Sequence, residues 1–230
     1  MLDDPHAYLE RSKLIDKQQE YNSSSERQPY NKLLSNILYI NIPTLYEIKP
    51  EDLENVFLPY KDVSEGLIID LRFNGGGSEY SARLLAEKYL IKNGEHVAGT
   101  NVKIAPEGGL KRIKVPVDSE NYEPYDKPIV ILTSKRTFSA AERFTALMKT
   151  GTDCILIGTE TAGGSANPVK YEFEYNKESY VVNILTWRYF LEGEDKPIEE
   201  TKIKPDIFYE GDDIVDFAVR YIKNTKKLNS

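Results

Sequence analysis

The segment Gly66–Arg72 (GLIIDLR) constrains the fold most, because it is apolar on both of its faces. A strand of this kind is typical of the centre of a parallel sheet that is covered on both sides. Three glycines at 75–77 follow it, and apolar residues then recur at helical spacing from Ala82 to Leu90. The strand Ile129–Leu132 is in turn followed by a helix predicted over Ser139–Lys149. Repeated strand–helix units predict an α/β domain with a mainly parallel sheet.

The other segments add strands and helices to this plan. We expect a strand at Ile37–Ile42, a short helix over residues 50–62, a strand at Ile155–Ile157 and a last helix that carries Ile214 to Tyr221, followed by a solvated tail. Residues 93–127 are rich in glycine and proline and are interpreted as an excursion from the main sheet. Residues 169–175 and 180–187 alternate in polarity and predict an antiparallel hairpin. Residues 10–32 are polar and are expected to form a linker or loop.

Composition excludes several classes of protein. The 230 residues carry 30 basic and 37 acidic side chains, and a net charge of −7 argues against general nucleic-acid binding. One cysteine, Cys154, allows no intrachain disulfide, and two histidines are too few for most histidine metal sites. The longest uncharged run, Leu33–Tyr46, is too short for a membrane span. We therefore expect no metal, no cofactor and no membrane span.

The first two candidate motifs stand at strand ends. Three glycines after a strand let the backbone approach a ligand closely, although a tight turn is the commoner explanation. The sequence at 137–142 (TFSAAE) contains Ser139 and Glu142 in the spacing of a capping box. From this motif alone a helix cap is favoured over a nucleophile, yet a serine at that point would also lie beside free amides that can stabilise an oxyanion.

Two further segments give weaker evidence for a functional site when each is taken by itself. Residues 158–165 (GTETAGGS) form a glycine turn after a short strand, and residues 198–206 (IEETKIKPD) suggest a charged loop before a strand.

Taken together, the four segments resemble the C-terminal-processing (tail-specific) serine protease family, in particular its branch with the tricorn core and the retinoid-binding repeats. The family pattern Asp-Leu-Arg-x-Asn-x-Gly-Gly is matched by residues 70–77, and Phe-Ser-Ala-Ala-Glu by residues 138–142. The turn Gly-x-x-Thr-x-Gly-Gly is matched by residues 158–164, and a late Glu followed by Pro-Asp by Glu199 and residues 205–206. The resemblance covers residues 35–222 and implies the crotonase/Clp-like spiral of that family's protease core.

The resemblance implies roles for residues near the predicted helix. Ser139 is the expected nucleophile, and the amides of Gly76 and Ala140 are the expected oxyanion hole, with Gly75 as a neighbouring candidate. Many members place a lysine base directly after the second glycine of the third motif, which is Gly163 here, and this sequence has Gly164 in that place. A dyad of that kind is therefore excluded, and Lys170 lies off the motif.

The tricorn-like branch uses a histidine base in a segment that resembles residues 2–9 (LDDPHAYL), which makes His6 the expected base. Glu199 takes the place of a glutamate that completes the array in that branch. A serine precedes the histidine there, whereas this sequence has Pro5.

For domain organisation we expect an N-terminal segment over residues 1–34, which carries the base, and a protease core over residues 35–230. Residues 10–35 are too few for a PDZ module. We expect no signal peptide within these residues, because residues 1–5 lack a basic start and an apolar stretch. Many relatives work in the cell envelope or outside the cell, so localisation and oligomeric state stay open.

The sequence thus predicts a serine peptidase that cleaves unfolded or short peptides through an acyl-enzyme. Two alternatives remain open: an inactive family member that binds an apolar ligand or peptide, and a structural domain of a larger complex.

Overall fold

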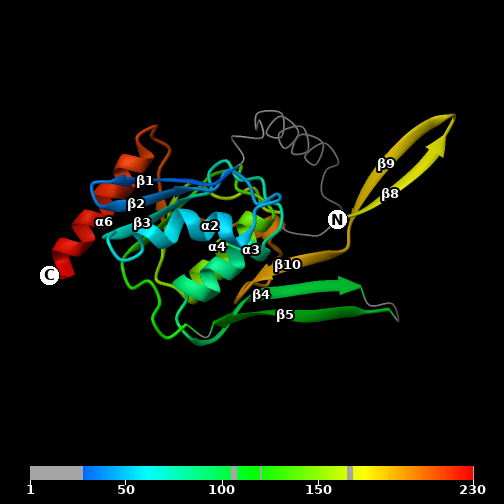
Figure 1. Cartoon of the computed structure of the whole chain (residues 1–230). Helices are drawn as coiled ribbons and strands as arrows, with labels where there is room; N and C mark the ends of the chain where they lie inside the picture. Colours follow the sequence, from blue (N-terminus) through cyan, green and yellow to red (C-terminus); the bar gives the residue numbers. More distant parts are fainter. Residues whose placement is uncertain (1–27, 105–107, 120, 165–167, 230) are drawn as a thin grey trace.

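A computed structural model describes residues 28–104, 108–119, 121–164 and 168–229 of the chain. Its central sheet has six strands in the order β1-β2-β3-β6-β7-β11 (Figure 1). The strands are β1 (Tyr30–Leu34), β2 (Ile37–Asn41), β3 (Gly66–Asp70), β6 (Ile129–Thr133), β7 (Ile155–Gly158) and β11 (Ile207–Phe208). All neighbours pair in parallel except β1, which pairs antiparallel with β2. This arrangement confirms the predicted α/β fold with a mainly parallel sheet.

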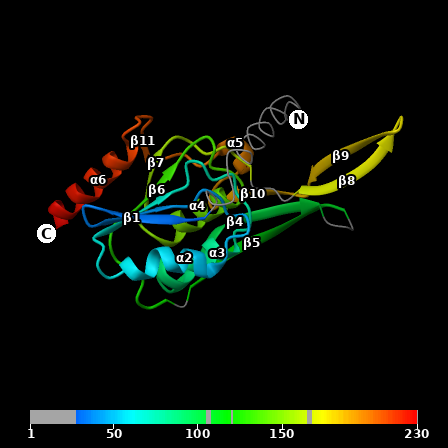
Figure 2. The same cartoon turned by 45° about the horizontal axis from the view of Figure 1, so that its top comes forward.

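Helices cover both faces of this sheet (Figure 2). One face packs against α2 (Pro50–Phe57), α3 (Tyr80–Leu85), which continues as one π-helical turn over Ala86–Leu90, and α4 (Ala140–Gly151). The other face packs against α6 (Ile214–Asn229). Strand β3 is fully buried because alternate side chains enter both cores: Leu67 and Ile69 join the first cluster, and Ile68 joins the second. The apolar run GLIIDLR is therefore a central strand, as the sequence predicts.

Two smaller sheets form the antiparallel additions. In the first, β4 (Gly94–Ile104) lies between β10 (Trp187–Leu191) and β5 (Leu110–Ser119). In the second, β8 (Pro168–Tyr175) pairs with β9 (Glu178–Leu185) across a two-residue turn. Asn176 and Lys177 both have positive φ in that turn, at 52° and 65°, as the type I′ hairpin turn requires.

Four details differ from the sequence prediction. Tyr30–Leu34 is a strand of the central sheet although residues 10–32 were expected to be a loop. The second hairpin strand ends at Leu185, and Trp187–Leu191 pairs with β4 instead. The charged segment at 198–206 contains a short helix, α5 (Ile198–Thr201), and the expected solvated tail continues α6 to Asn229. In the described part of the chain, none of the helices has the length and apolar character that a membrane crossing requires.

Candidate active site

The site lies where three neighbouring parallel strands end. The glycine run follows β3, the turn with Ser139 follows β6, and the turn at Gly163 and Gly164 follows β7. Because β3, β6 and β7 are adjacent in the sheet, their carboxyl ends bring these three turns together. Ligand sites of open α/β sheets typically form at such an edge. The order of the strands therefore joins motifs that are up to 90 residues apart in sequence.

Ser139 occupies a strained turn directly before α4. Its backbone has φ 56° and ψ −120°, a conformation that non-glycine residues rarely adopt and that is concentrated at functional sites. The turn is held by the Ser139 N–H, which donates to the carbonyl of Gly164 at 2.9 Å and to Oε2 of Glu142 at 3.0 Å. The residue is half-buried, so the side chain at this helix N-terminus is not sealed in the core.

Gly76 brings the backbone of the glycine run against Ser139. A Cβ at Gly76 would lie 2.7 Å from Cβ of Ser139 and 3.1 Å from the backbone nitrogen of Ala140, and the residue has φ 102°. Only glycine fits this position without displacing the serine turn. The close approach that the sequence suggested for the glycine run is therefore directed at Ser139.

Asn74 fixes the glycine run in this place. Its buried side chain donates to the carbonyl of Ile42 at 2.9 Å and accepts the N–H of Gly76 at 2.9 Å. Its own carbonyl accepts the N–H of Phe138 at 3.0 Å. One side chain and one peptide group thus tie the exit of β2, the glycine run and the serine turn into a single unit.

The three predicted oxyanion-hole amides differ in their hydrogen bonding. The N–H of Gly76 is bonded to Asn74. Among the described residues, no acceptor is bonded to the N–H of Ala140, which is the first residue of α4, or to that of Gly75. A Cβ built on Gly75 would meet nothing within 4 Å, so there is open space beside this backbone.

Glu142 closes the serine turn from inside the protein. Its carboxylate has no exposed surface and accepts four hydrogen bonds, from the N–H groups of Ser139 (3.0 Å), Gly163 (2.8 Å) and Gly164 (2.9 Å) and from the hydroxyl of Thr161 (2.5 Å). Burial raises the pKa of Glu142 to about 7, and the bonds from Thr161 and the three amides oppose that increase. The sequence predicted the capping bond to Ser139, but not the other three bonds.

The short helix α5 packs against the third turn. A Cβ on Gly163 would lie 2.9 Å from the carbonyl oxygen of Ile198 and 3.4 Å from that of Glu199. Both side-chain oxygens of Glu199 are buried, whereas the next residue, Glu200, is exposed. The carboxylate of Glu199 is therefore buried on a helix that contacts the Gly163 turn, and Glu200 belongs to the solvated face of α5.

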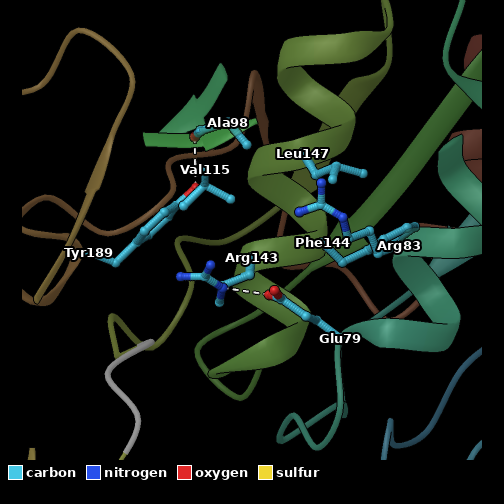
Figure 3. A pocket seen from close by; sticks show the side chains of 8 residues that line it. All are labelled: Glu79, Arg83, Ala98, Val115, Arg143, Phe144, Leu147 and Tyr189. Atoms are coloured by element: carbon cyan, nitrogen blue, oxygen red, sulfur yellow. Dashed lines mark hydrogen bonds and ion pairs between the residues drawn. The ribbon is translucent and has the colours of Figure 1, made fainter. Parts of the chain in front are cut away.

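Arg143 joins α4 to the segment that follows the glycine run (Figure 3). Its guanidinium forms an ion pair with Glu79, donates to Oδ1 of Asn101 at 3.0 Å and lies 4.5 Å from the ring centroid of Tyr189. Asn101 and Tyr189 belong to the three-stranded sheet. The first turn of α4 is thus braced on one side by Glu142 and on the other by Arg143.

The remaining predicted residues lie elsewhere. His6 lies outside the described residues. Lys170 is exposed on the β8–β9 hairpin, where its Nζ pairs with Oε1 of Glu172 at 2.5 Å. Gly164 stands where related motifs carry a lysine, and a Cβ there would lie 2.3 Å from the ring of Phe138. Over the part of the chain that the structure describes, no cluster of His, Cys, Asp and Glu side chains could hold a metal ion.

Sequence reasoning missed the contributions of Asn74 and Thr161. Both are buried polar residues inside the motifs, and each makes hydrogen bonds to two different segments: Thr161 accepts the N–H of Ile203 at 3.0 Å and donates to Glu142. A buried polar residue in a turn usually has a bonding partner, but the sequence does not say which segment supplies it.

Comparisons with known proteins agree with this geometry. The sequence model of the family described as Peptidase family S41 matches residues 36–209 of this chain. The tail-specific protease of Haemophilus influenzae is 30% identical over 129 residues, which are 56% of this chain and 17% of that protein. The crystal structure of a putative peptidase from Parabacteroides merdae superposes with a TM-score of 0.66 at 21% identity, over 89% of this chain and 65% of that one. The photosystem II D1 C-terminal processing protease gives a TM-score of 0.55 at 20% identity, over 76% and 42% of the two chains.

The chain spans only part of the length of these relatives, from 17% of the tail-specific protease to 65% of the Parabacteroides peptidase. The structural similarities support the fold. The match to the family model extends over most of this chain. On that match, together with the serine turn, the glycine run and the third turn in their expected order, the chain belongs to peptidase family S41.

Proposed function

We propose that the chain is a serine peptidase that cleaves unfolded or short peptides through an acyl-enzyme, with Ser139 as the nucleophile. The observation that supports this most is the strained Ser139 turn, packed against Gly76 and followed by the open N–H of Ala140. A nucleophile must be exposed to substrate and must lie beside donors that can bind an oxyanion. A serine that only capped a helix would need neither the strained backbone nor the glycine packed against it.

In the proposed reaction the Ser139 Oγ attacks the carbonyl carbon of a peptide bond. The base, for which His6 is our candidate, takes the hydroxyl proton and later gives it to the departing amine. Water then attacks the acyl-enzyme, releases the new carboxyl group and restores the serine.

The oxyanion would be bound by the Ala140 amide together with the Gly75–Gly76 backbone. The backbone of Gly75 lies beside open space, and the N–H of Gly76 would share its proton between Asn74 and the oxyanion. The positive end of the α4 dipole adds to this stabilisation, because it lies at Ala140. Glu199, whose carboxylate oxygens are buried, is proposed to support the base.

Extended peptides suit this chemistry. An unfolded or short chain can present its backbone to a turn that lies at the edge of a sheet, whereas a folded loop is held in another conformation.

A fluorophosphonate probe and casein hydrolysis test the proposal. The probe should label wild-type protein at Ser139, and Ser139→Ala should lose both labelling and hydrolysis, because no other group can form the acyl-enzyme. Ser78→Ala is the matched control: Ser78 is an exposed serine beside the glycine run and should leave both signals unchanged. Hydrolysis by Ser139→Ala at the wild-type rate would refute the mechanism. A folded wild-type protein that neither reacts with the probe nor cleaves casein would favour the inactive binding module.

A further inference from the structure

The β8–β9 hairpin extends away from the rest of the molecule (Figures 1 and 2). In the described part of the chain the two strands pair only with each other. Every residue of Pro168–Tyr175 and Glu178–Leu185 is exposed. A two-stranded hairpin without a covering layer is at best marginally stable in water. The hairpin therefore lacks a packing partner within the described chain.

One face of this hairpin is apolar over its whole length. Alternation along the strands and the register of Tyr171 with Val182 place seven apolar side chains on the same side. Their exposed fractions range from 39% to 63%. The seven are Val169, Tyr171, Phe173, Tyr175, Tyr180, Val182 and Ile184. We call this the apolar hairpin face.

The opposite face is mostly polar. Lys170, Glu172 and Glu174 alternate with the apolar residues on β8, and Ser179 and Asn183 stand across from them on β9. Such a separation of polar and apolar side chains is typical of a sheet with one face buried. The hairpin sequence thus has the pattern of a sheet with one covered face, but none of the described residues covers that face.

The area of the apolar hairpin face suits a protein partner. Taking about 200 Å² for each aromatic side chain, the exposed parts of the four aromatic residues give roughly 400 Å², and the three aliphatic residues bring the face to roughly 600 Å². The largest apolar patch of a monomeric protein is about 300–600 Å². Two such faces together would bury about 1,200 Å², which reaches the lower limit for a stable, specific interface.

The area and charge of this face favour a second copy of the chain over other occupants. Phe173 and Tyr180 are stacked, with centroids 5.5 Å apart and planes inclined by 16°, so the two strands hold an aromatic pair in the middle of the face. An extended peptide would add to a strand edge and not to a face. The seven side chains of the face include no cation that would attract anionic lipid, and at the tip Glu178 stands beside Lys177 of the turn.

We propose that two copies of this chain associate through their apolar hairpin faces, packed against each other about a two-fold axis. The same patch on both copies then covers itself, as an isologous interface requires. The polar faces with Lys170 and Glu172 point outward on both sides, and the Ser139 turns stay outside the contact. This inference does not depend on the proposed peptidase activity.

Adjacent valines offer a matched test. Val182 lies on the apolar hairpin face and is 41% exposed, and Val181 lies on the opposite face and is 54% exposed. Sedimentation velocity over a wide range of protein concentration should show wild-type protein moving from the 26.3 kDa monomer towards twice that mass. Val182→Lys should stay monomeric at every concentration, because two charges would be buried in the contact. Val181→Lys should dimerise like wild type, because its new charge faces water opposite Glu172.

Three other outcomes would overturn the proposal. The wild type could be monomeric at all concentrations, or the dimer could persist in Val182→Lys. The dimer could also be lost in both variants, which would mean that the contact involves both faces of the hairpin. A monomeric wild type that co-sediments with phosphatidylcholine vesicles would assign the face to lipid. Thermal melting of both variants serves as the control for a folded core. Casein hydrolysis tests the Ser139 site separately from the dimer.

Discussion

The Glu142 carboxylate lies at the centre of the candidate site, with no exposed surface and four hydrogen-bond donors around it. Three of those donors are backbone N–H groups, from Ser139, Gly163 and Gly164. Because these donors belong to the backbone, their bonds to one carboxylate hold the backbone of the serine turn against that of the third turn. Among the motif residues it is the one whose loss should disturb the most neighbours at once.

Glu142→Gln should therefore destabilise the fold and change the pH dependence of stability. The amide NH₂ of glutamine would face N–H donors, and a buried unsatisfied donor costs about 1–3 kcal/mol. Because burial raises the pKa of Glu142 to about 7, the native state binds a proton that the unfolded state has already lost between about pH 4.5 and 7. Unfolding then releases that proton, so the contribution of Glu142 to stability is full below pH 4.5 and falls as pH rises to 7.

Urea unfolding of both proteins between about pH 5.5 and 8 measures this effect. Over this range the wild-type free energy of unfolding, relative to Glu142→Gln, should decrease with pH by about 2 kcal/mol, since one pKa unit corresponds to about 1.4 kcal/mol and about 1.5 pH units lie between pH 5.5 and the raised pKa. A difference that is constant, or that grows with pH, would contradict a raised pKa.

Glu199 and Glu200 provide a second comparison between single residues. Both are acidic residues of α5, but the side-chain oxygens of Glu199 are buried and Glu200 is exposed. If Glu199 supports the base, Glu199→Gln should lower kcat by tenfold or more, and Glu200→Gln should stay near the wild-type rate. Steady-state hydrolysis of a peptide substrate measures both. Equal, near-wild-type rates would place Glu199 outside the reaction.

The elements of the core were more predictable than their connections. Strands β2, β3, β6 and β7 and helix α4 follow from apolar runs and helical spacing, because each depends mainly on its own residues. The break at Thr186 could not be predicted in this way, since Trp187–Leu191 leaves the hairpin to pair with β4, almost 90 residues earlier. Helix α5 was missed because four residues carry too little periodicity, and its stability comes from packing against the Gly163 turn.

That packing of α5 can be tested with two glycines that have nearly equal φ angles. Gly163 has φ 79° and Gly193 has φ 81°, so alanine at either position is strained by about 1–2 kcal/mol. Only Gly163 is crowded: its Cβ would lie 2.9 Å from the Ile198 carbonyl oxygen, and Gly193 has nothing within 4 Å.

Gly163→Ala should therefore lower the melting temperature more than Gly193→Ala and should also reduce hydrolysis, because the displaced turn carries two of the bonds to Glu142. Thermal melting and casein assays of the two variants give the comparison. Equal decreases in melting temperature and hydrolysis in both variants would mean that α5 can shift away from Gly163 without disturbing the site.

At the scale of the whole molecule, the central sheet brings the predicted nucleophile, the amides and Glu199 to one edge, while the predicted base belongs to the N-terminal segment over residues 1–34. The sequence motifs located Ser139, Gly75, Gly76 and Ala140 at this edge because a parallel sheet aligns the ends of its strands. The hydrogen bonds of Asn74 and Thr161 could not be predicted, because they depend on which segments meet there. His6 was expected only from the resemblance of residues 2–9 to a family segment, and it stays a prediction.

The pH dependence of hydrolysis tests that base directly. A histidine must be neutral to accept the Ser139 proton, so kcat/KM should rise with pH through one ionisation near the reference value of about 6.5. A lysine base, even one lowered by burial to about 7–8, would titrate later. The rising limb should disappear in His6→Ala and survive in Lys170→Ala, because Lys170 is exposed and paired with Glu172. Burial raises the pKa of Glu142 to about 7, so Glu142→Gln is a necessary control. If His6 is the base, that variant should be slower but keep its midpoint. A midpoint that vanishes in Glu142→Gln and persists in His6→Ala would assign the limb to the buried carboxylate and remove His6 from the mechanism.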